Sequence, residues 1–180
     1  MLDSPVDAYY TGDNAQMPRE EPMQEIRFDD LDTLGTKVSD DYGPWGPELE
    51  ITQDMINKFA DLTGDHQWIH VDVERSKRES PFGGTIAHGF LTLSLLPVLR
   101  TGSDYKIVGY GNATNYGADK LRFISPVPAG SKVHARARLV AVDAKPKGTQ
   151  MTQEIAVHVV GNDRPALLYT MLVLYHPPLK

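Results

Sequence analysis

Cysteine is absent from all 180 residues of this chain. Disulfide bonds, catalytic thiolates and zinc–thiolate sites are therefore excluded, and a reducing compartment is favoured. The first residues, MLDSPVDAYY, lack the basic segment and apolar run of a secretory signal. The longest apolar stretch, 85–99, contains His88 and Pro97 and is shorter than the ~20 residues that a membrane span needs. These absences predict a cytoplasmic protein that does not contact a membrane.

Basic residues are scarce in the first part of the chain. The formal net charge is −6, yet residues 1–50 carry 13 acidic and 3 basic side chains, whereas residues 51–180 carry 11 acidic and 15 basic ones. Because the chain as a whole repels a phosphate backbone, we expect no nucleic-acid partner. The mildly basic body is compatible with a small phosphorylated ligand.

The amino-terminal segment has no apolar periodicity. Residues 1–24 are rich in Asp, Glu, Pro, Gly, Asn and Gln, which is typical of an extended arm. We therefore divide the chain into an acidic N-terminal arm, residues 1–24, and one domain, residues 25–180. A chain of this length can bury roughly 70% of its unfolded surface in one core. Isolated apolar residues among acids and turn formers predict an irregular lead-in over residues 25–50.

Two helices are predicted in the first half of the domain. The first begins after Thr52, a good N-cap, and ends at Gly64, which suits a left-handed C-cap. The second, IAHGFLTLSLL at 86–96, is apolar on nearly all sides, as in a buried helix, and Pro97 should end or kink it. The apolar side chains of the first helix recur at helical spacing: Met55, Ile56, Phe59 and Leu62.

From about residue 113 the pattern changes to strands. Apolar and polar side chains alternate in VHARARLVAV, and again in EIAVHV, and a turn precedes the third segment, LLYTMLVLY. Three strands joined by short turns predict an antiparallel meander, and a fourth strand is expected near 120–124. One long buried helix followed by four antiparallel strands indicates an α+β fold in which a sheet wraps around a helix.

The stretch TGDHQWIH, residues 63–70, concentrates groups that transfer protons. His66 and His70 have a helical zinc spacing, but Gly64 argues against a helix and no further ligand completes the set, so we expect no metal. Asp65 and His70 can instead converge on one water as an acid/base pair. The alternative is that Asp65 caps the helix end and His70 is a hydrogen-bonded strand residue.

Other catalytic and nucleotide-binding motifs are not supported. GYGNAT, residues 109–114, has a threonine where the third glycine of a dinucleotide fingerprint belongs, and no Gly-Lys-Ser/Thr triplet occurs. Ser94 lies inside the apolar helix without the G-x-S-x-G turn that exposes a nucleophile. We therefore expect no nucleotide cofactor.

FADLTGDHQWIHVD, IAHGFLTLSLL and NYGADKLRFISPVPAGSKV together resemble the MaoC-like, or (R)-specific enoyl-CoA hydratase, family over residues 45–175, and most closely its NodN-like branch. The resemblance implies a hot-dog fold, a long central helix wrapped by a curved antiparallel β-sheet, in a homodimer. It implies (R)-specific hydration of trans-2-enoyl-CoA, or enoyl-carrier-protein, thioesters to (R)-3-hydroxyacyl thioesters, without a cofactor. By this resemblance, Asp65 and His70 are the catalytic pair, and the backbone N–H of Gly89 polarises the thioester carbonyl.

One departure from the family pattern affects the substrate. Hydratases of this family usually have Asn-Pro where this chain has Gln67 and Trp68, and the larger Trp either alters the acyl pocket or packs beneath it. Two alternative functions stay open. One is an acyl-CoA thioesterase of the same fold, and the other is a non-catalytic protein that binds acyl thioesters.

Four further polar residues are functional candidates: His66, His88, Lys120 and Arg122. We expect His66 to face solvent and His88 to bond loop backbone beside the carbonyl-polarising amide. Lys120 and Arg122 share one strand face, for which solvation is the default expectation and contact with the phosphates of CoA the alternative.

Overall fold

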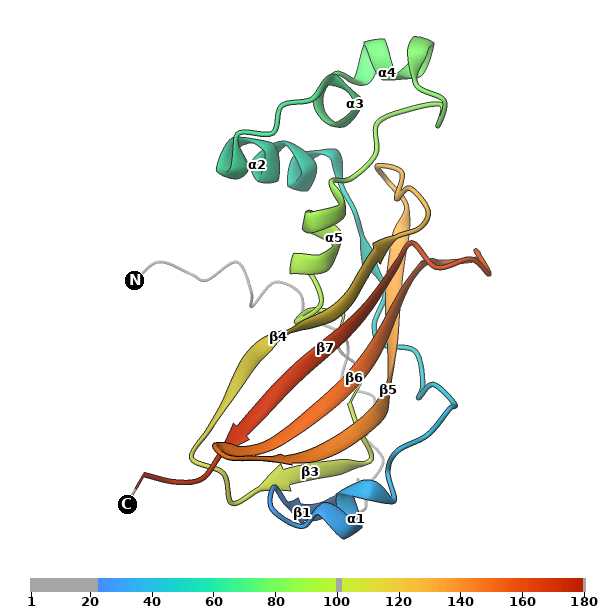
Figure 1. Ribbon diagram of the computed structural model, residues 1–180. Helices are drawn as coiled ribbons and strands as arrows, with labels where there is room; N and C mark the ends of the chain where they lie inside the picture. The colour runs from blue at the N-terminus through green and yellow to red at the C-terminus, as the bar shows by residue number, and fades with distance from the viewer. Residues whose placement is uncertain (1–22, 100–101, 180) are drawn as a thin grey trace, which may run out of the picture.

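The computed structural model describes residues 23–99 and 102–179 (Figure 1). The expected acidic arm, residues 1–24, lies outside the described residues except for Met23 and Gln24, and Gln24 already belongs to the first strand. The elements follow in the order β1 (Gln24–Arg27), α1 (Leu31–Gly35), β2 (Leu49–Glu50), α2 (Gln53–Thr63), α3 (Trp68–Val71), α4 (Val73–Glu79), α5 (Gly89–Ser94), β3 (Tyr105–Val108), β4 (Asn112–Phe123), β5 (Lys132–Lys145), β6 (Gly148–Val159) and β7 (Leu167–His176).

A five-stranded antiparallel sheet with the order β2-β5-β6-β7-β4 forms the body of the molecule. The predicted meander is confirmed as β5-β6-β7, and the fourth predicted strand is the end of the longer β4. Figure 1 shows this sheet curving from α2, α3 and α4 at one end to β1, α1 and β3 at the other, with α5 beside its upper part.

Helix α2 begins and ends at the residues that the sequence predicts. The Thr52 hydroxyl accepts a hydrogen bond from the Met55 N–H, and Gly64 adopts the left-handed conformation at φ 78°. One predicted core position is wrong, because Leu62 is 82% exposed and Ala60 lies on the buried face instead. The caps thus place Asp65 immediately after a fixed helix end.

Helix α5 is shorter than the predicted helix over 86–96. It spans only Gly89–Ser94. The chain before it is extended, because the Ala87 N–H donates to the carbonyl of Val127 and Ile86 forms a bridge with Pro128. After it, residues 95–98 form turns, as expected before a residue without an N–H at Pro97. The fold places Gly89 at the first turn of this short helix.

The lead-in over residues 25–50 is more regular than predicted. It contains α1 and β2, and β1 pairs in parallel with β3, about 80 residues further along the chain. The main core lies between α2, α5 and the sheet, and a second, smaller core lies beneath β1 and α1. Among the described residues, no helix combines the length and the apolar character that a membrane span requires.

Candidate active site

Asp65 lies on the loop that leaves helix α2. Gly64 turns the chain, and the exposed carboxylate of Asp65 accepts a long hydrogen bond, 3.4 Å, from the N–H of Gln67. Because the Asp65 side chain is exposed, its second carboxylate oxygen is free to face a substrate. The prediction that Asp65 follows a helix terminus on irregular backbone is confirmed.

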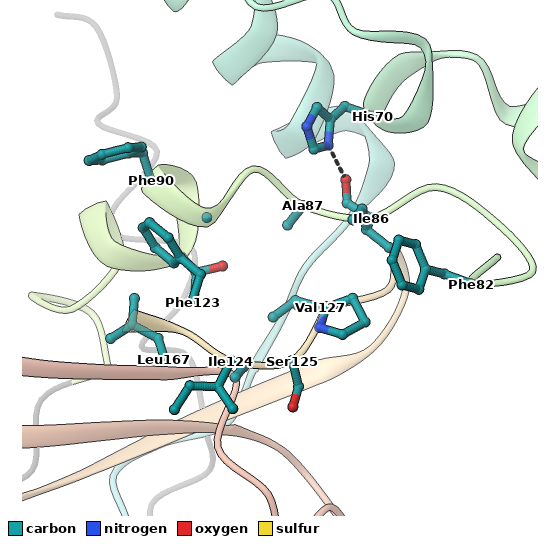
Figure 2. Close-up of a pocket in the computed structure, with 14 residues that line it drawn as sticks. His70, Phe82, Ile86, Ala87, Phe90, Phe123, Ile124, Ser125, Val127 and Leu167 are labelled. Carbon is teal, nitrogen blue, oxygen red and sulfur yellow. Dashed lines mark hydrogen bonds between the residues drawn. The ribbon is translucent and has the colours of Figure 1, made fainter. Parts of the chain in front are cut away.

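His70 lies on α3, a single helical turn rather than the irregular or extended backbone that the sequence indicated. Its ring is 9% exposed, and its Nδ1 lies 2.7 Å from the carbonyl oxygen of Ile86 (Figure 2). A carbonyl only accepts, so Nδ1 carries the proton in this contact. In the neutral ring, Nε2 is then an unprotonated acceptor that can take a proton from water.

His66 does not share a face with His70. It precedes α3, and its Nε2 lies 3.7 Å from the Asp61 carboxylate at the exposed surface. The predicted solvent-facing position of His66 is therefore confirmed. The helical zinc spacing of the two histidines does not correspond to a shared site.

His88 joins the two catalytic candidates. Its side chain is 4% exposed, and its Nε2 lies 2.9 Å from the backbone carbonyl oxygen of Asp65. Its ring stacks on that of His70 with a centroid distance of 3.8 Å and an interplanar angle of 28°. The prediction that His88 bonds loop backbone is confirmed. One buried ring thus fixes the loop of Asp65 against the imidazole of His70.

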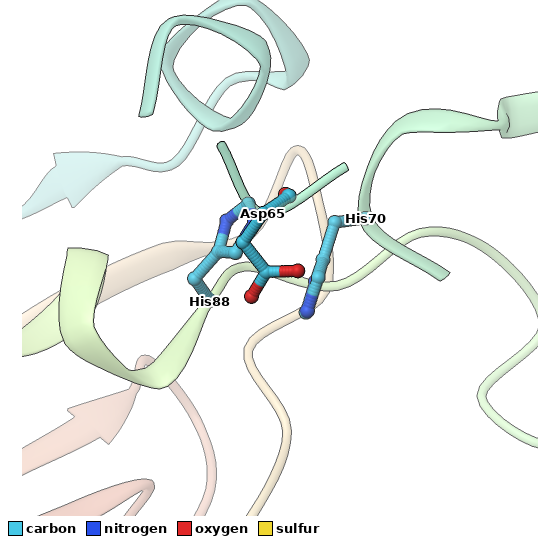
Figure 3. Close-up of side chains that lie close together, drawn as sticks. All are labelled: Asp65, His70 and His88. Carbon is cyan, nitrogen blue, oxygen red and sulfur yellow. The ribbon is translucent and has the colours of Figure 1, made fainter. Parts of the chain in front are cut away.

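Asp65, His70 and His88 form one cluster (Figure 3), in which a donor atom of each lies within 4.8 Å of the others. Such a set raises the question of a metal ion. His70 Nδ1 and His88 Nε2 already contact backbone carbonyls. Proton transfer needs only the carboxylate of Asp65 and the free Nε2 of His70 near one water, and this cluster provides both groups.

Gly89 is the first residue of α5, where backbone N–H groups have no partner within the helix. A Cβ at this position would lie 2.7 Å from Cδ1 of the Phe123 ring. Real Cβ atoms do not approach ring carbons so closely, so the packing of Phe123 requires glycine here.

A pocket of about 410 Å³ has both His70 and Gly89 in its wall (Figure 2). Asp65 does not line this pocket, but its carboxylate is clustered with the imidazole of His70. Apart from Thr92, Ser125 and His70, its wall is apolar, as expected for a site that holds an acyl chain or another apolar group. The apolar side chains come from α5, its leading segment and the ends of β4 and β7: Phe82, Ile86, Ala87, Phe90, Phe123, Ile124, Pro126, Val127, Ala166 and Leu167.

Residues 43–161 match the MaoC like domain. The chain belongs to the MaoC-like dehydratase family. It is 51% identical over 128 residues to 3-hydroxyacyl-thioester dehydratase Z of Mycobacterium tuberculosis, covering 71% of this chain and 83% of that protein. It is 44% identical over 148 residues to nodulation protein N of Rhizobium meliloti, covering 81% of this chain and 88% of that protein. The predicted membership, with its NodN-like relatives, is confirmed.

Solved structures of MaoC-like proteins have the same fold. The (R)-hydratase from A. caviae involved in PHA biosynthesis matches with a TM-score of 0.59 and 22% identity, covering 76% of this chain and 98% of that one. A monoamine oxidase regulatory protein from Archaeoglobus fulgius matches with a TM-score of 0.61 and 28% identity, covering 76% of this chain and 91% of that one. The predicted hot-dog fold is therefore confirmed.

The unusual Trp68 of this MaoC-like chain packs outside the pocket. Its half-buried indole lies under the guanidinium of Arg75, whose Cζ is 4.3 Å from the ring centroid. Trp68 does not line the pocket. Of the two expectations for this residue, the structure supports packing over a change in the shape of the acyl pocket. Lys120 and Arg122 are exposed and also lie outside the pocket wall, and Arg122 donates to the backbone carbonyl of Leu121.

Two residues beside the site were missed by sequence reasoning. Phe123 covers Gly89, and Gln53 contacts the backbone of His70. Phe123 ends an exposed strand, and Gln53 occupies the first turn of an amphipathic helix, where polar residues are ordinary. Neither residue carries a local sequence signal, so only the tertiary contacts show that it lies beside the site.

Proposed function

We propose that this MaoC-like protein hydrates trans-2-enoyl thioesters to (R)-3-hydroxyacyl thioesters and catalyses the reverse dehydration. The observation that carries the proposal is the arrangement of Asp65 and His70 beside an apolar pocket that also contains the amide of Gly89. The relative that is 51% identical is named as a 3-hydroxyacyl-thioester dehydratase, which supports the same reaction here.

The Asp65 carboxylate and the unprotonated Nε2 of His70 hold one water in this proposal. As the water oxygen bonds to C3 of the substrate, the pair accepts one proton from that water, and one proton is returned to C2. The C2–C3 double bond is lost and no other group leaves. The hydrogen bond from His70 Nδ1 to the Ile86 carbonyl keeps the ring in the tautomer that this step needs.

Negative charge develops on the thioester oxygen while water adds. In this proposal the N–H of Gly89, at the first turn of α5, stabilises that charge. One such donor is worth on the order of 10² to 10³ in rate, and a positioned acid/base pair contributes a similar factor. The apolar wall would hold the acyl chain and limit access of bulk water.

A panel of enoyl-CoA substrates from crotonyl- to dodecenoyl-CoA tests the proposal. We expect the absorbance of the conjugated enoyl thioester to fall on addition of pure protein, without release of free thiol. Release of free thiol would identify a thioesterase instead. Tight binding of acyl-CoA with no turnover by folded protein, across CoA and carrier-protein substrates, would identify a binding protein.

The homodimer is also a proposal. Strand β4 lies at the edge of the sheet, and along its outer side no strand of the described residues pairs with it. It exposes Tyr116 and Phe123, and unpaired edge strands of this kind are usually covered. Sedimentation equilibrium should give twice the mass of the chain, and a single-chain mass at micromolar concentration would contradict the dimer.

A further inference from the structure

The imidazole of His70 is held between two backbone segments that are paired with each other. The N–H of Ile86 donates to the carbonyl of Ile69 at 3.1 Å, and His70 Nδ1 lies 2.7 Å from the carbonyl oxygen of Ile86. Any sliding of one segment past the other would rotate the ring or break this hydrogen bond. The relative position of the two segments is therefore what sets the direction of Nε2.

Gln53 bridges the same two segments from the first turn of α2. Its Nε2 donates to the carbonyl oxygen of His70 at 2.7 Å, and its Oε1 accepts a hydrogen bond from the hydroxyl of Thr85. Thr85 is 5% exposed and directly precedes Ile86, whose carbonyl contacts the imidazole. One amide thus connects the backbone of the catalytic histidine to the segment that orients its ring.

The bridge requires a group that donates and accepts at the same time. A carboxylate at this position would accept from Thr85 but would place an oxygen against the carbonyl of His70. An aliphatic side chain of the same length would leave both partners without a hydrogen bond in a poorly hydrated place. The Gln53 amide can therefore make both hydrogen bonds, whereas a carboxylate makes only one and an aliphatic side chain makes neither.

We propose that Gln53 is a positioning residue for His70. This inference rests on the proposed hydratase function, in which the direction of Nε2 controls the water. Outer hydrogen-bond partners that orient a metal-binding histidine are typically worth roughly 10-fold to 100-fold, and we expect a loss of the same order for this catalytic histidine. Gln53 does not line the pocket, so its removal should lower kcat and leave KM nearly unchanged.

Three variants test the bridge, with Asn57→Ala as the matched control. Gln53→Leu should lower kcat at least about tenfold with little change in KM. Thr85→Val removes the hydroxyl that donates to Gln53 and should also lower kcat. Thr85→Ser keeps this hydroxyl and should have a kcat close to that of the wild type. Asn57 accepts from Gln53 Nε2 at 2.9 Å but contacts neither segment, so Asn57→Ala should keep wild-type kcat.

A proton NMR signal separates positioning from a merely structural role, without any need for turnover. The Nδ1 proton of His70, assigned by its loss in His70→Asn, should be visible downfield in the wild type and lost or shifted in Gln53→Leu. A lower melting temperature with unchanged kcat and an unchanged Nδ1 signal would overturn the proposal. If Gln53→Leu does not fold, the Thr85→Val and Thr85→Ser pair decides by the same two readouts. A wild type without hydratase activity would refute the function, while the NMR comparison would still decide whether Gln53 holds the ring.

Discussion

The imidazoles of His70 and His88 are stacked at 3.8 Å, and His88 also contacts the backbone of Asp65. The two residues that we propose to share a water are thus linked through a third side chain that is more deeply buried than either. This arrangement gives the loop after α2 a defined position relative to α3. It also places Gly89, the next residue in the chain, at a fixed distance from the pair.

Replacing His88 with alanine should slow catalysis. His88→Ala removes the ring that stacks on His70 and the hydrogen bond to the Asp65 carbonyl, so both proposed catalytic groups gain freedom. We expect kcat for crotonyl-CoA to fall at least about tenfold, since small losses of alignment are costly in rate. His66→Ala is the matched control, because this exposed loop histidine pairs with the surface carboxylate of Asp61. Equal rates for the two variants would argue against a role for the stack.

Adding one methyl group at Gly89 should damage both packing and catalysis. The Cβ of Gly89→Ala would lie 2.7 Å from the Phe123 ring, which must move into the pocket or away from α5. We expect kcat/KM to fall by about 10² if the amide loses access to the thioester oxygen. The double variant Gly89→Ala, Phe123→Leu should recover part of the loss. Full activity of Gly89→Ala alone would show that the Phe123 ring gives way without blocking the amide, and it would contradict this prediction.

The outer face of the sheet should contribute stability that depends on pH. A hydrogen bond from the Tyr42 hydroxyl, and then the Arg138 guanidinium, lower the pKa of the Glu154 carboxyl, which is 27% exposed. The pKa is lower in the folded state, so this stability is present above the unfolded pKa and is lost as pH falls through the folded one. Glu154→Gln should therefore lower the free energy of unfolding by about 1–2 kcal/mol near pH 7.

Urea unfolding at two pH values checks this prediction. Near pH 7 the wild type should be more stable than Glu154→Gln, and near pH 3 the two curves should approach each other. A difference that stays constant between these pH values would assign the effect to packing and not to the charge. Glu154 does not line the pocket, so hydratase activity of the variant serves as a check on folding.

Local signals explain which parts of the fold the sequence predicts. The ends of α2 are set by Thr52 and Gly64, whose capping interactions involve only residues nearby in the sequence. The predicted start and end of this helix are both confirmed. Alternation of apolar and polar residues along β5 and β6 likewise indicates a sheet with one buried face. The predicted length of α5 was wrong because residues 85–87 pair with a segment about 40 residues away. The parallel pair β1 and β3 is equally invisible to local patterns.

The candidate site divides in the same way. The spacing of polar groups selects Asp65 and His70, and the family resemblance adds Gly89. The structure brings the first two together and places His70 and Gly89 on the wall of one pocket. The sequence motifs do not reveal that the ring of His88 stacks on His70, or that Gln53 donates a hydrogen bond to the carbonyl of His70. These contacts join separate elements, so they follow only from the tertiary structure.

The rate of enoyl-CoA hydration by Asp65→Asn tests the central claim most directly. Asparagine keeps the size of the side chain but cannot accept a proton from water, so kcat should fall by about 10² or more. The melting temperature and the His70 Nδ1 signal should stay close to those of the wild type, because the side chain is exposed and the contact with His88 uses the backbone of residue 65. A folded Asp65→Asn protein that hydrates crotonyl-CoA at the wild-type rate would contradict the account.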